Sequence, residues 1–279
     1  MATRRRAFGS IRPAGKTSWQ ASYKVDGRRF IAPSTFPSKA DASAWLANVQ
    51  ADINRGVWTD PTAGRQTLAQ YVAGWLDRKQ KVGHYRIVGL IDSDRSTPEG
   101  LDGLSVLGTE EDLPRVVRAL DVFGGIVGVG DNWTRSNLAQ RIRAAVPAFE
   151  FVNAVHPSAE VARGVVLGCG VFLGPGAVVN TNSQIGDHCF MGAKASLDHD
   201  CILNRCASLA PGVTVGGGVV IGEFSGISLG ACVIHGIRIG AHTVVGAGAT
   251  VLSDIPDHVV AYGSPARVVR SRQEGDPYL

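Results

Sequence analysis

Residues 185–221 read IGDHCF-MGAKAS-LDHDCI-LNRCAS-LAPGVT-VGGGVV-I, and every block of six opens with an apolar side chain. The same spacing runs from Val155 to Val251, which makes seventeen apolar positions in succession. Four residues after each of them lies a small or β-branched residue, and glycine often follows the apolar position directly. A repeat of this regularity indicates an architecture built from one small unit.

A period of six matches neither the 3.6-residue α-helix nor the two-residue strand. It is typical of a solenoid coil whose short flat sides each turn one aliphatic side chain inward, with glycine at corners where φ is often positive. Stacked coils bury a continuous aliphatic column and pair their strands along the axis. Cys189 and Cys201 fall in the small interior position, so we interpret them as packed thiols and not as catalytic ones.

The composition agrees with a folded, glycine-rich chain. Of 279 residues, 44% are hydrophobic and 19% are charged, which excludes disorder as the main state. There are 35 glycines, well above an average of about 7%. No apolar run approaches the ~20 residues of a membrane span, and the start lacks a signal-peptide pattern. The five cysteines form no CxxC pair, so we expect a cytoplasmic protein without disulfides, without a metal site and without a membrane partner.

The charge is divided unevenly along the chain. Residues 1–82 hold 14 Lys and Arg against 5 Asp, a net charge of +9, whereas the remainder holds 14 against 19 acidic residues, a net charge of −5. Such a split indicates two modules with different partners, one of which is a candidate for binding a polyanion.

One block of the repeat carries three polar residues at its corner, Asp198, His199 and Asp200, between Leu197 and Cys201, which keep the interior rhythm. An imidazole beside a carboxylate is the minimal general-base unit, because the carboxylate sets the tautomer and stabilises the imidazolium. The alternative is a solvated surface histidine. The acidic neighbours favour His199 over the other histidines of the repeat.

The corner Asp198–Cys201, the following Ala210–Val213 and the closing Gly263–Val269 resemble the NeuD/PglD-type sugar O-/N-acyltransferases, and the likeness runs from about residue 85 to residue 269. The resemblance implies a left-handed parallel β-helix and a homotrimer with acetyl-CoA clefts between adjacent copies. It also implies direct acetyl transfer from acetyl-CoA to a sugar or a nucleotide-linked amino sugar. His199 would be the general base, and Asp200 would orient it.

The same match implies the acetyl-CoA contacts. The pantetheine-lining positions fall on Gly217, Leu229 and Ala247, and Ser208 stands where the family often has a second histidine near the acetyl group. A serine can still donate a hydrogen bond there, but it cannot carry charge. Gly192 replaces an asparagine that is common in the family.

Residues 83–153 alternate between strand-like and helix-like patterns, which predicts a parallel sheet with crossover helices. We expect strands over 86–91, 103–107, 125–130 and 149–152, and helices over 109–120 and 132–146. The resemblance identifies this segment as an incomplete Rossmann-like sugar-binding domain, with Asp92, Gly130 and Asn132 as substrate-binding positions. For the glycine turn at 128–130 the alternative is tight strand–helix packing. The family's opening strand and GxxGH-type loop are missing, so we predict weak nucleotide-sugar binding and an acetyltransferase activity impaired by that loss. Residues 66–82, which precede this domain, are predicted to form a helix or linker.

Residues 1–65 predict a small α+β module. Strands are expected over 7–12, 18–25 and 28–32, with a hairpin turn at Asp26-Gly27, followed by a helix over 38–54 that starts with a capping box. This stretch resembles the arm-type DNA-binding domain of phage-type tyrosine integrases, and a helix from Thr67 resembles the start of their core-binding domain. Duplex DNA is the implied partner, and a solvated basic face is the alternative. The candidate DNA-binding residues are Arg4, Arg5, Arg6, Lys16, Arg28 and Arg29, beside Arg12 and Lys24.

The predicted organisation is therefore a fusion. Its parts are the integrase-like module (1–65), the linker (66–82), the incomplete Rossmann-like domain (83–153), the β-helix (154–269) and a tail (270–279). The leading function is acetyl-CoA-dependent acetylation of a sugar. Two alternatives stay open: a DNA-binding fusion protein with a catalytically impaired trimeric β-helix scaffold, and a recombination product without a selected function.

Overall fold

The computed structural model describes residues 8–15, 18–25, 27–32, 34–54, 85–92 and 104–276. The chain divides into two compact units, Met1–Arg65 and Gln66–Leu279. The predicted helix from Thr67 lies outside the described residues. Among the described residues, no helix has both the length and the apolar character that crossing a membrane requires.

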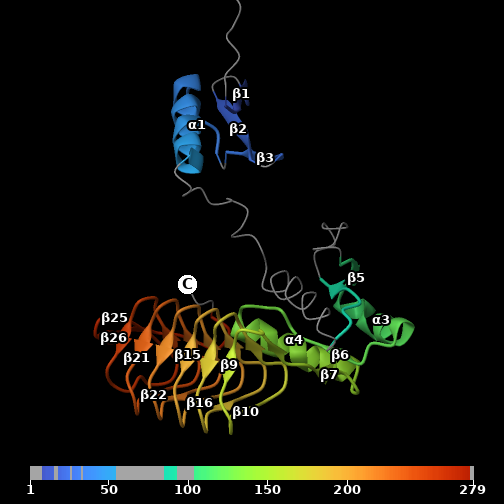
Figure 1. Cartoon of the computed structure of the whole chain (residues 1–279), viewed down its shortest axis with the longest axis vertical. Coiled ribbons are helices and arrows are strands. Elements are labelled where there is room, and N and C mark those ends of the chain that lie inside the picture. The colour runs from blue at the N-terminus through green and yellow to red at the C-terminus, as the bar shows by residue number, and fades with distance from the viewer. Residues whose placement is uncertain are drawn as a thin grey trace, which may run out of the picture. The chain divides into compact units, whose positions relative to one another are not determined.

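The first unit is an antiparallel sheet with one helix packed against it (Figure 1). Its elements are β1 (Ser10–Pro13), β2 (Trp19–Val25), β3 (Arg28–Ile31) and α1 (Lys39–Asn54). Tyr23, Phe30 and Leu46 are buried between the sheet and α1. The predicted strands and helix of this module are thus confirmed, with boundaries moved by one to three residues.

Local signals set the turns of this unit. Val25 pairs with Arg28 across a two-residue loop, and Gly27 has a φ of +81°, which a side chain would disfavour. The backbone N–H of Asp41 donates to Ser38 Oγ at 3.1 Å, so Ser38 caps the start of α1 as the sequence predicts.

The second unit contains the solenoid. Its two-residue strands form three parallel sheets of eight, six and five strands, the eight-stranded one including a closing hairpin (Figure 1). Partners within a sheet are 18 residues apart, as for Phe172 and Phe190. The strands are β8 (Ala154–Val155), β9 (Glu160–Val161), β10 (Val166–Leu167), β11 (Phe172–Leu173), β12 (Val178–Val179), β13 (Gln184–Ile185), β14 (Phe190–Met191), β15 (Ser196–Leu197), β16 (Ile202–Leu203), β17 (Ser208–Leu209), β18 (Thr214–Val215), β19 (Val220–Ile221), β20 (Gly226–Ile227), β21 (Cys232–Val233), β22 (Arg238–Ile239), β23 (Val244–Val245) and β24 (Thr250–Val251).

The apolar residue that opens each six-residue block is the second residue of one of these strands. From Leu173 onward the side chains of these apolar residues are buried in one column. Three strands per coil and one inward aliphatic residue per strand explain both the period of six and the partner spacing of 18. The parallel β-helix is thus confirmed, and its arrangement fits the left-handed form.

An antiparallel hairpin closes the solenoid. It consists of β25 (Val259–Gly263), which pairs in parallel with β23, and β26 (Ala266–Ser271). The chain then turns back, and Arg272 N donates to His258 O at 2.8 Å. Gly275 lies against the indole of Trp133, so this part of the expected tail packs within the second unit.

The segment before the β-helix differs from its predicted single sheet. Residues 85–92 and 104–151 form two separate two-stranded parallel sheets. Their elements are β4 (Leu90–Ile91) with β5 (Val106–Gly108), β6 (Gly124–Gly125) with β7 (Glu150–Phe151), the 3-10 turn η2 (Glu110–Asp112), α3 (Leu113–Leu120) and α4 (Asn132–Ala145). The helices are close to prediction, and Thr109 begins the first one with a capping box. The strands are shorter than expected.

The strand predicted over 125–130 ends at Gly125, and a side chain bonds two carbonyl groups of its predicted far end. Arg135 Nη1 donates to Val129 O at 2.9 Å and to Gly130 O at 3.0 Å. A neighbouring strand would otherwise satisfy these acceptors. Arg135, which is buried in α4, therefore satisfies these two carbonyl groups in place of a neighbouring strand.

Candidate active site

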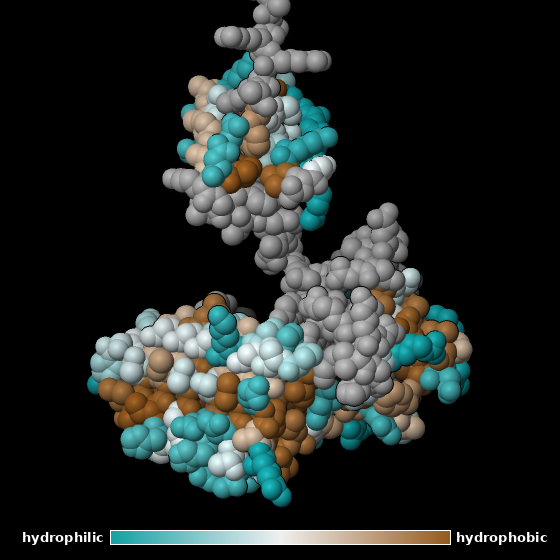
Figure 2. All heavy atoms as spheres, viewed as in Figure 1, coloured by the Kyte–Doolittle hydropathy of each residue, from teal (hydrophilic) through white to brown (hydrophobic). Residues whose placement is uncertain are grey.

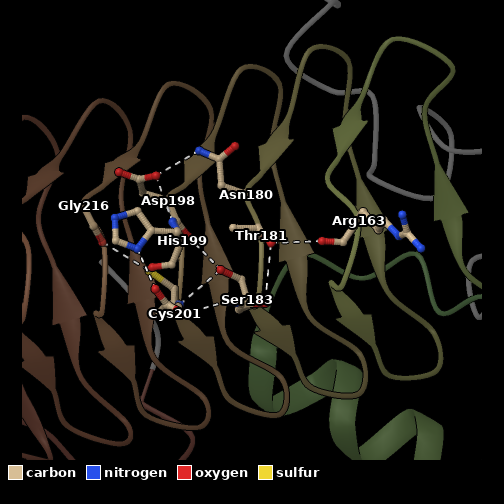
Figure 3. Close-up of polar contacts among 10 residues, drawn as sticks. Arg163, Asn180, Thr181, Ser183, Asp198, His199, Cys201 and Gly216 are labelled. Carbon is tan, nitrogen blue, oxygen red and sulfur yellow. Dashed lines mark hydrogen bonds and ion pairs between the residues drawn. The ribbon is translucent and has the colours of Figure 1, made fainter.

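The polar corner at residues 198–200 lies between β15 and β16, where the chain passes from the six-stranded sheet to the five-stranded sheet. Leu197 and Cys201 are fully buried on either side, so the three polar residues are turned outward. Ser183, inside the preceding coil, donates to Asp198 O at 2.7 Å and accepts from Cys201 N at 3.1 Å. Both ends of the corner are thereby held to the frame (Figure 3).

His199 and Asp200 form the predicted base–carboxylate pair. His199 Nδ1 lies 2.7 Å from Asp200 Oδ2, and the two side chains are 56% and 57% exposed. The hydrogen bond to Asp200, helped by the charge of Asp198, raises the pKa of His199. The same hydrogen bond, followed by one from Asn182, lowers the pKa of Asp200. With Nδ1–H donating to the carboxylate, the lone pair of the neutral ring is on Nε2.

Gly217, one coil further along, lies against the opposite edge of the imidazole. A Cβ atom at this position would stand 2.6 Å from His199 Nε2, so any side chain there would cover the basic nitrogen. Gly217 thus leaves room at the atom that would accept a proton.

Two asparagines in the preceding coil, which no sequence pattern had singled out, hold the two acids. Asn180 Nδ2 donates to Asp198 Oδ1 at 2.9 Å, and the same oxygen accepts the backbone N–H of His199 at 2.8 Å (Figure 3). Asn182 Nδ2 donates to Asp200 Oδ1 at 3.1 Å. Each asparagine precedes its acid by 18 residues, so counting one full coil back from the corner would have found both.

The other predicted acetyl-CoA positions are divided between different parts of the coil. Gly217 shares the corner of His199, whereas Leu229 and Ala247 share the corner that leads from the eight-stranded to the six-stranded sheet. On that corner, Gly248 N donates to Leu229 O at 2.8 Å. Ser208 is in β17 of the eight-stranded sheet. A single β-helix therefore presents these groups at two different corners and in one of its sheets.

Ser208 meets the start of α4. Asn132 Nδ2 donates to Ser208 Oγ at 3.2 Å and to Ser225 O at 3.2 Å, while Asn132 Oδ1 accepts from Arg135 Nη2 at 2.5 Å. Arg135 also donates to His188 O at 2.8 Å and to Cys206 O at 3.2 Å. This buried network, which no sequence pattern had indicated, fastens α4 to the β-helix.

A pocket of about 190 Å³ lies at this junction, lined by Gly130, Phe190, Ser208, Ala210, Gly226, Ile227 and Ser228. Two of the predicted substrate-binding positions are here: Gly130 lines the pocket, and Asn132 contacts Ser208 in its wall. The third, Asp92, follows β4, and its N–H donates to Gly108 O at 3.1 Å. The structure therefore brings Gly130, Asn132 and Ser208 together and places Asp92 on the other small sheet.

The two thiols predicted to be packed, those of Cys189 and Cys201, lie in the interior of the β-helix. Cys189 and Cys201 are buried, and burial raises the pKa of both, to about 12 for Cys189. A thiol with a raised pKa is a poor nucleophile, in agreement with the packing interpretation. Within the described part of the chain, no group of three or more His, Cys, Asp and Glu residues is arranged to hold a metal ion.

In the first unit, side-chain alternation puts Arg12, Lys24 and Arg29 on the sheet face opposite α1, since Tyr23 and Phe30 face the helix. Arg29 Nη2 donates to Ser22 Oγ at 3.0 Å. A hollow of about 610 Å³ is lined by Phe8, Gly9, Ser10, Arg12, Ser22, Tyr23, Lys24 and Arg29. The Arg28 guanidinium lies 5.8 Å from the Phe30 ring centroid. Arg4, Arg5, Arg6 and Lys16 lie outside the described residues.

Two family models match the chain. The phage integrase N-terminal domain matches residues 7–55, and the bacterial transferase hexapeptide model, six repeats long, matches residues 164–199. The chain is also 40% identical over 92 residues to a prophage phiRv2 integrase of Mycobacterium tuberculosis, covering 29% of this chain and 24% of that protein. The chain thus spans about a quarter of the length of this curated relative.

Solved structures match the second unit. PerB from Caulobacter crescentus, in complex with CoA and GDP-perosamine, is 36% identical with a TM-score of 0.66, and the match covers 73% of this chain and 93% of that one. The acetyltransferase domain of PglB from Neisseria gonorrhoeae, in complex with acetyl coenzyme A, is 29% identical with a TM-score of 0.64 and the same coverage. Little of either structure lacks a counterpart here.

Proposed function

The chain belongs to the hexapeptide-repeat sugar acetyltransferases of the PerB/PglB type, and on this premise we propose that it transfers an acetyl group from acetyl-CoA to an amino sugar, with His199 as general base. The observation that carries the proposal is the His199–Asp200 pair at 2.7 Å, with Nε2 of the ring over Gly217. Such a pair can remove a proton from an incoming nucleophile and stabilise the imidazolium that results.

The proposed reaction is a direct transfer. Nε2 of His199 accepts a proton as the amine or hydroxyl of the sugar attacks the thioester carbonyl of acetyl-CoA. The new C–N or C–O bond forms, the C–S bond breaks, and the proton passes to the departing CoA thiolate. Asp200 accepts the Nδ1 hydrogen bond throughout, which keeps the ring in one tautomer.

We propose that a second copy of the chain completes the site. His199 and Gly217 are on one corner of the β-helix, while the proposed acetyl-CoA positions Leu229 and Ala247 are on another. Leu229, Ile234 and Leu252 are exposed beside the six-stranded sheet, on the side of the β-helix that Figure 2 shows with a hydrophobic band. We propose a homotrimer, with acetyl-CoA between the His199 corner of one copy and the Leu229 corner of the next. A stable monomer at micromolar concentration in light scattering would contradict it.

The proposed acceptor site is the pocket beside Ser208. PerB is solved with GDP-perosamine, and we extend that substrate class, a nucleotide-linked amino sugar, to this chain. Gly130 and Asp92 are the proposed contacts from the Rossmann-like segment, and Asn132 acts by holding Ser208, since its amide already contacts Ser208, Ser225 and Arg135. The absence of a glycine-rich loop in the sequence predicts a high KM for the nucleotide sugar.

The direct test is release of free CoA thiol from acetyl-CoA by the full chain, screened against amino sugars and nucleotide-linked amino sugars. Acceptor-dependent thiol release, with one acetyl group gained by the acceptor in mass spectrometry, is the expected result. If no acceptor raises thiol release above the hydrolysis rate, the proposed acetyl transfer is contradicted, and the DNA-binding test below separates the scaffold alternative from a recombination product without a selected function. A low KM for a nucleotide sugar would contradict the role given to the missing loop.

We propose duplex DNA binding as a second function, carried by residues 1–65. The supporting observation is the basic face formed by Arg12, Lys24 and Arg29 opposite α1, in a unit that has its own hydrophobic core. Affinity should fall linearly on logarithmic axes as salt rises, because phosphate contacts release counterions.

The fragment of residues 1–65 tests this with two matched variants. Lys24→Ala should reduce the salt slope by about 0.9 if Lys24 contacts one phosphate, whereas Lys39→Ala, which removes a lysine from α1, should leave it unchanged. No binding at low salt would reduce the basic face to a solvated surface. Removing the whole module should affect acetyl transfer far less than removing His199.

A further inference from the structure

The His199 ring receives side-chain support from one side only. The coil after it contributes Gly216, Gly217 and Gly218, which have no side chains to hold the imidazole. The coil before it contributes Asn180, Thr181 and Asn182 at the same corner. Apart from Asp198 and Asp200, any side chain of this chain that helps to orient His199 at this corner must therefore come from the preceding coil.

Asn182 is placed for this task. Its amide donates to Oδ1 of Asp200 at 3.1 Å, while Oδ2 of the same carboxylate is 2.7 Å from His199 Nδ1. One oxygen of the Asp200 carboxylate thus contacts the Asn182 amide, and the other contacts the His199 imidazole. Both Asn182, with a φ of +60°, and Asp200, with a φ of +57°, have left-handed backbone conformations. Asparagine tolerates this conformation better than most residues and also supplies a donor.

We propose that Asn182 is a positioning residue for the acetyl transfer, which fixes the rotation of the Asp200 carboxylate and through it the orientation of the His199 ring. The catalytic meaning of this proposal rests on the proposed function. Asn180 provides the comparison, since its amide reaches Asp198, whose carboxylate accepts the backbone N–H of His199 and not the ring. Only the Asn182 contact leads to the imidazole.

The charges that face the imidazole are few. Over the three coils concerned, residues 180–182, 198–200 and 216–218, the ionisable neighbours are Asp198 and Asp200, and Asp200 is the one bonded to the ring. The proton affinity of His199 therefore reports on how well Asp200 is held. The side chain is 56% exposed in the single chain and faces the cleft proposed for acetyl-CoA, so a small reagent can reach it when that cleft is empty.

The test measures the rate of His199 modification by diethyl pyrocarbonate against pH, on the full chain without substrates, with mass spectrometry separating the seven histidines. Asn182→Gly removes the amide and suits the left-handed backbone. Asn182→Asp keeps the shape and places a second carboxylate beside Asp200. Lys194→Gly is the matched control, because Lys194 is an exposed corner residue with a φ of +58°.

The modification midpoint should move to lower pH in Asn182→Gly, because a mobile carboxylate stabilises the imidazolium less. It should move to higher pH in Asn182→Asp, because negative charge is added, and it should stay at the wild-type value in Lys194→Gly. In the acetyl-transfer assay, kcat of Asn182→Gly should fall about twofold to tenfold, the value of one hydrogen bond, with acetyl-CoA binding unchanged.

A wild-type midpoint in Asn182→Gly would overturn the proposal, as would the same direction of shift in both Asn182 variants. The midpoints decide this whether or not the chain acetylates a sugar. If the midpoints shift but wild-type protein transfers no acetyl group, the proposed function fails while the positioning contact stands.

Discussion

The β-helix and residues 104–153 belong to one compact unit, but their order has different origins. In the β-helix each coil packs on neighbouring coils with the same strand arrangement, and the buried column from Leu173 to Val251 is continuous. In residues 104–153 the strands pair only two by two, the buried set around Val127, Ala139 and Phe151 is small, and a buried arginine connects the segment to the solenoid. The β-helix is therefore stabilised by contacts that repeat from coil to coil, whereas residues 104–153 are stabilised largely by their contacts with the β-helix.

The proposed activity uses both regions. His199 and Asp200 are on a corner of the repeated frame, whereas Gly130 and Asn132 take their positions from the docked segment. Changes to the corner should therefore alter chemistry without altering stability. Changes at the docking contacts should alter the pocket while the base stays in place.

The largest effect is expected at the base. His199→Ala should reduce kcat by about 10²–10⁴-fold, the usual contribution of a positioned general base, with acetyl-CoA binding nearly unchanged. Thiol release and a separate acetyl-CoA titration measure the two quantities. His235→Ala, an exposed histidine of the same corner two coils further along, is the control and should have little effect. Full activity of His199→Ala would disprove the mechanism.

Two leucine-to-alanine substitutions, one in the β-helix and one in residues 104–153, compare the stability of the two regions. Leu203→Ala in the β-helix column should cost about 2–5 kcal/mol of unfolding free energy, because neighbouring coils cannot close the cavity. Leu113→Ala in α3 should cost about 2 kcal/mol, because the smaller cluster can relax. Hydrogen exchange should show opening confined to the docked segment for Leu113→Ala. Equal loss of protection across the whole second unit would show that the two regions unfold together.

The docking contact itself comes next in size. Arg135→Met should weaken the local stability of α4 by about 1–3 kcal/mol for each carbonyl left buried and unpaired, without loosening the coils beyond it. Amide exchange in α4 and a raised KM for the sugar are the readouts. Arg141→Met is the control, since its ion pair with Glu110 is exposed and should contribute at most about 1 kcal/mol. Equal exchange in the two variants would contradict the role of Arg135.

The smallest effect concerns pH. Asp200 raises the pKa of His199, and the base acts in its neutral form, so kcat should fall as pH decreases through a value above that of an ordinary imidazole. Asp200→Asn should move this limb to lower pH and reduce the plateau by about tenfold or less, because the base itself remains. An unmoved limb would show that Asp200 does not set the protonation of His199.

Particular residues show how far sequence reasoning reaches. The six-residue period located the strands of the β-helix, and Ser38 and Thr109 located helix starts, because these signals act within one coil or one turn. The strand expected over 125–130 stops at Gly125, and Arg135, which in the sequence resembles an exposed residue, is buried and satisfies the carbonyl groups of Val129 and Gly130. The pocket beside Ser208 could not be predicted from the sequence either, because it forms only where α4 packs against β17.

The sequence by itself determined the solenoid, the inward column and the outward corner that carries His199, because each depends on residues at most one coil apart. Only the tertiary structure decided that Asn132 contacts Ser208, that Arg135 is buried against the β-helix, and that the pocket beside Ser208 forms between α4 and β17. These facts depend on side chains meeting across coils and across separate segments, where spacing along the chain no longer specifies distance in space.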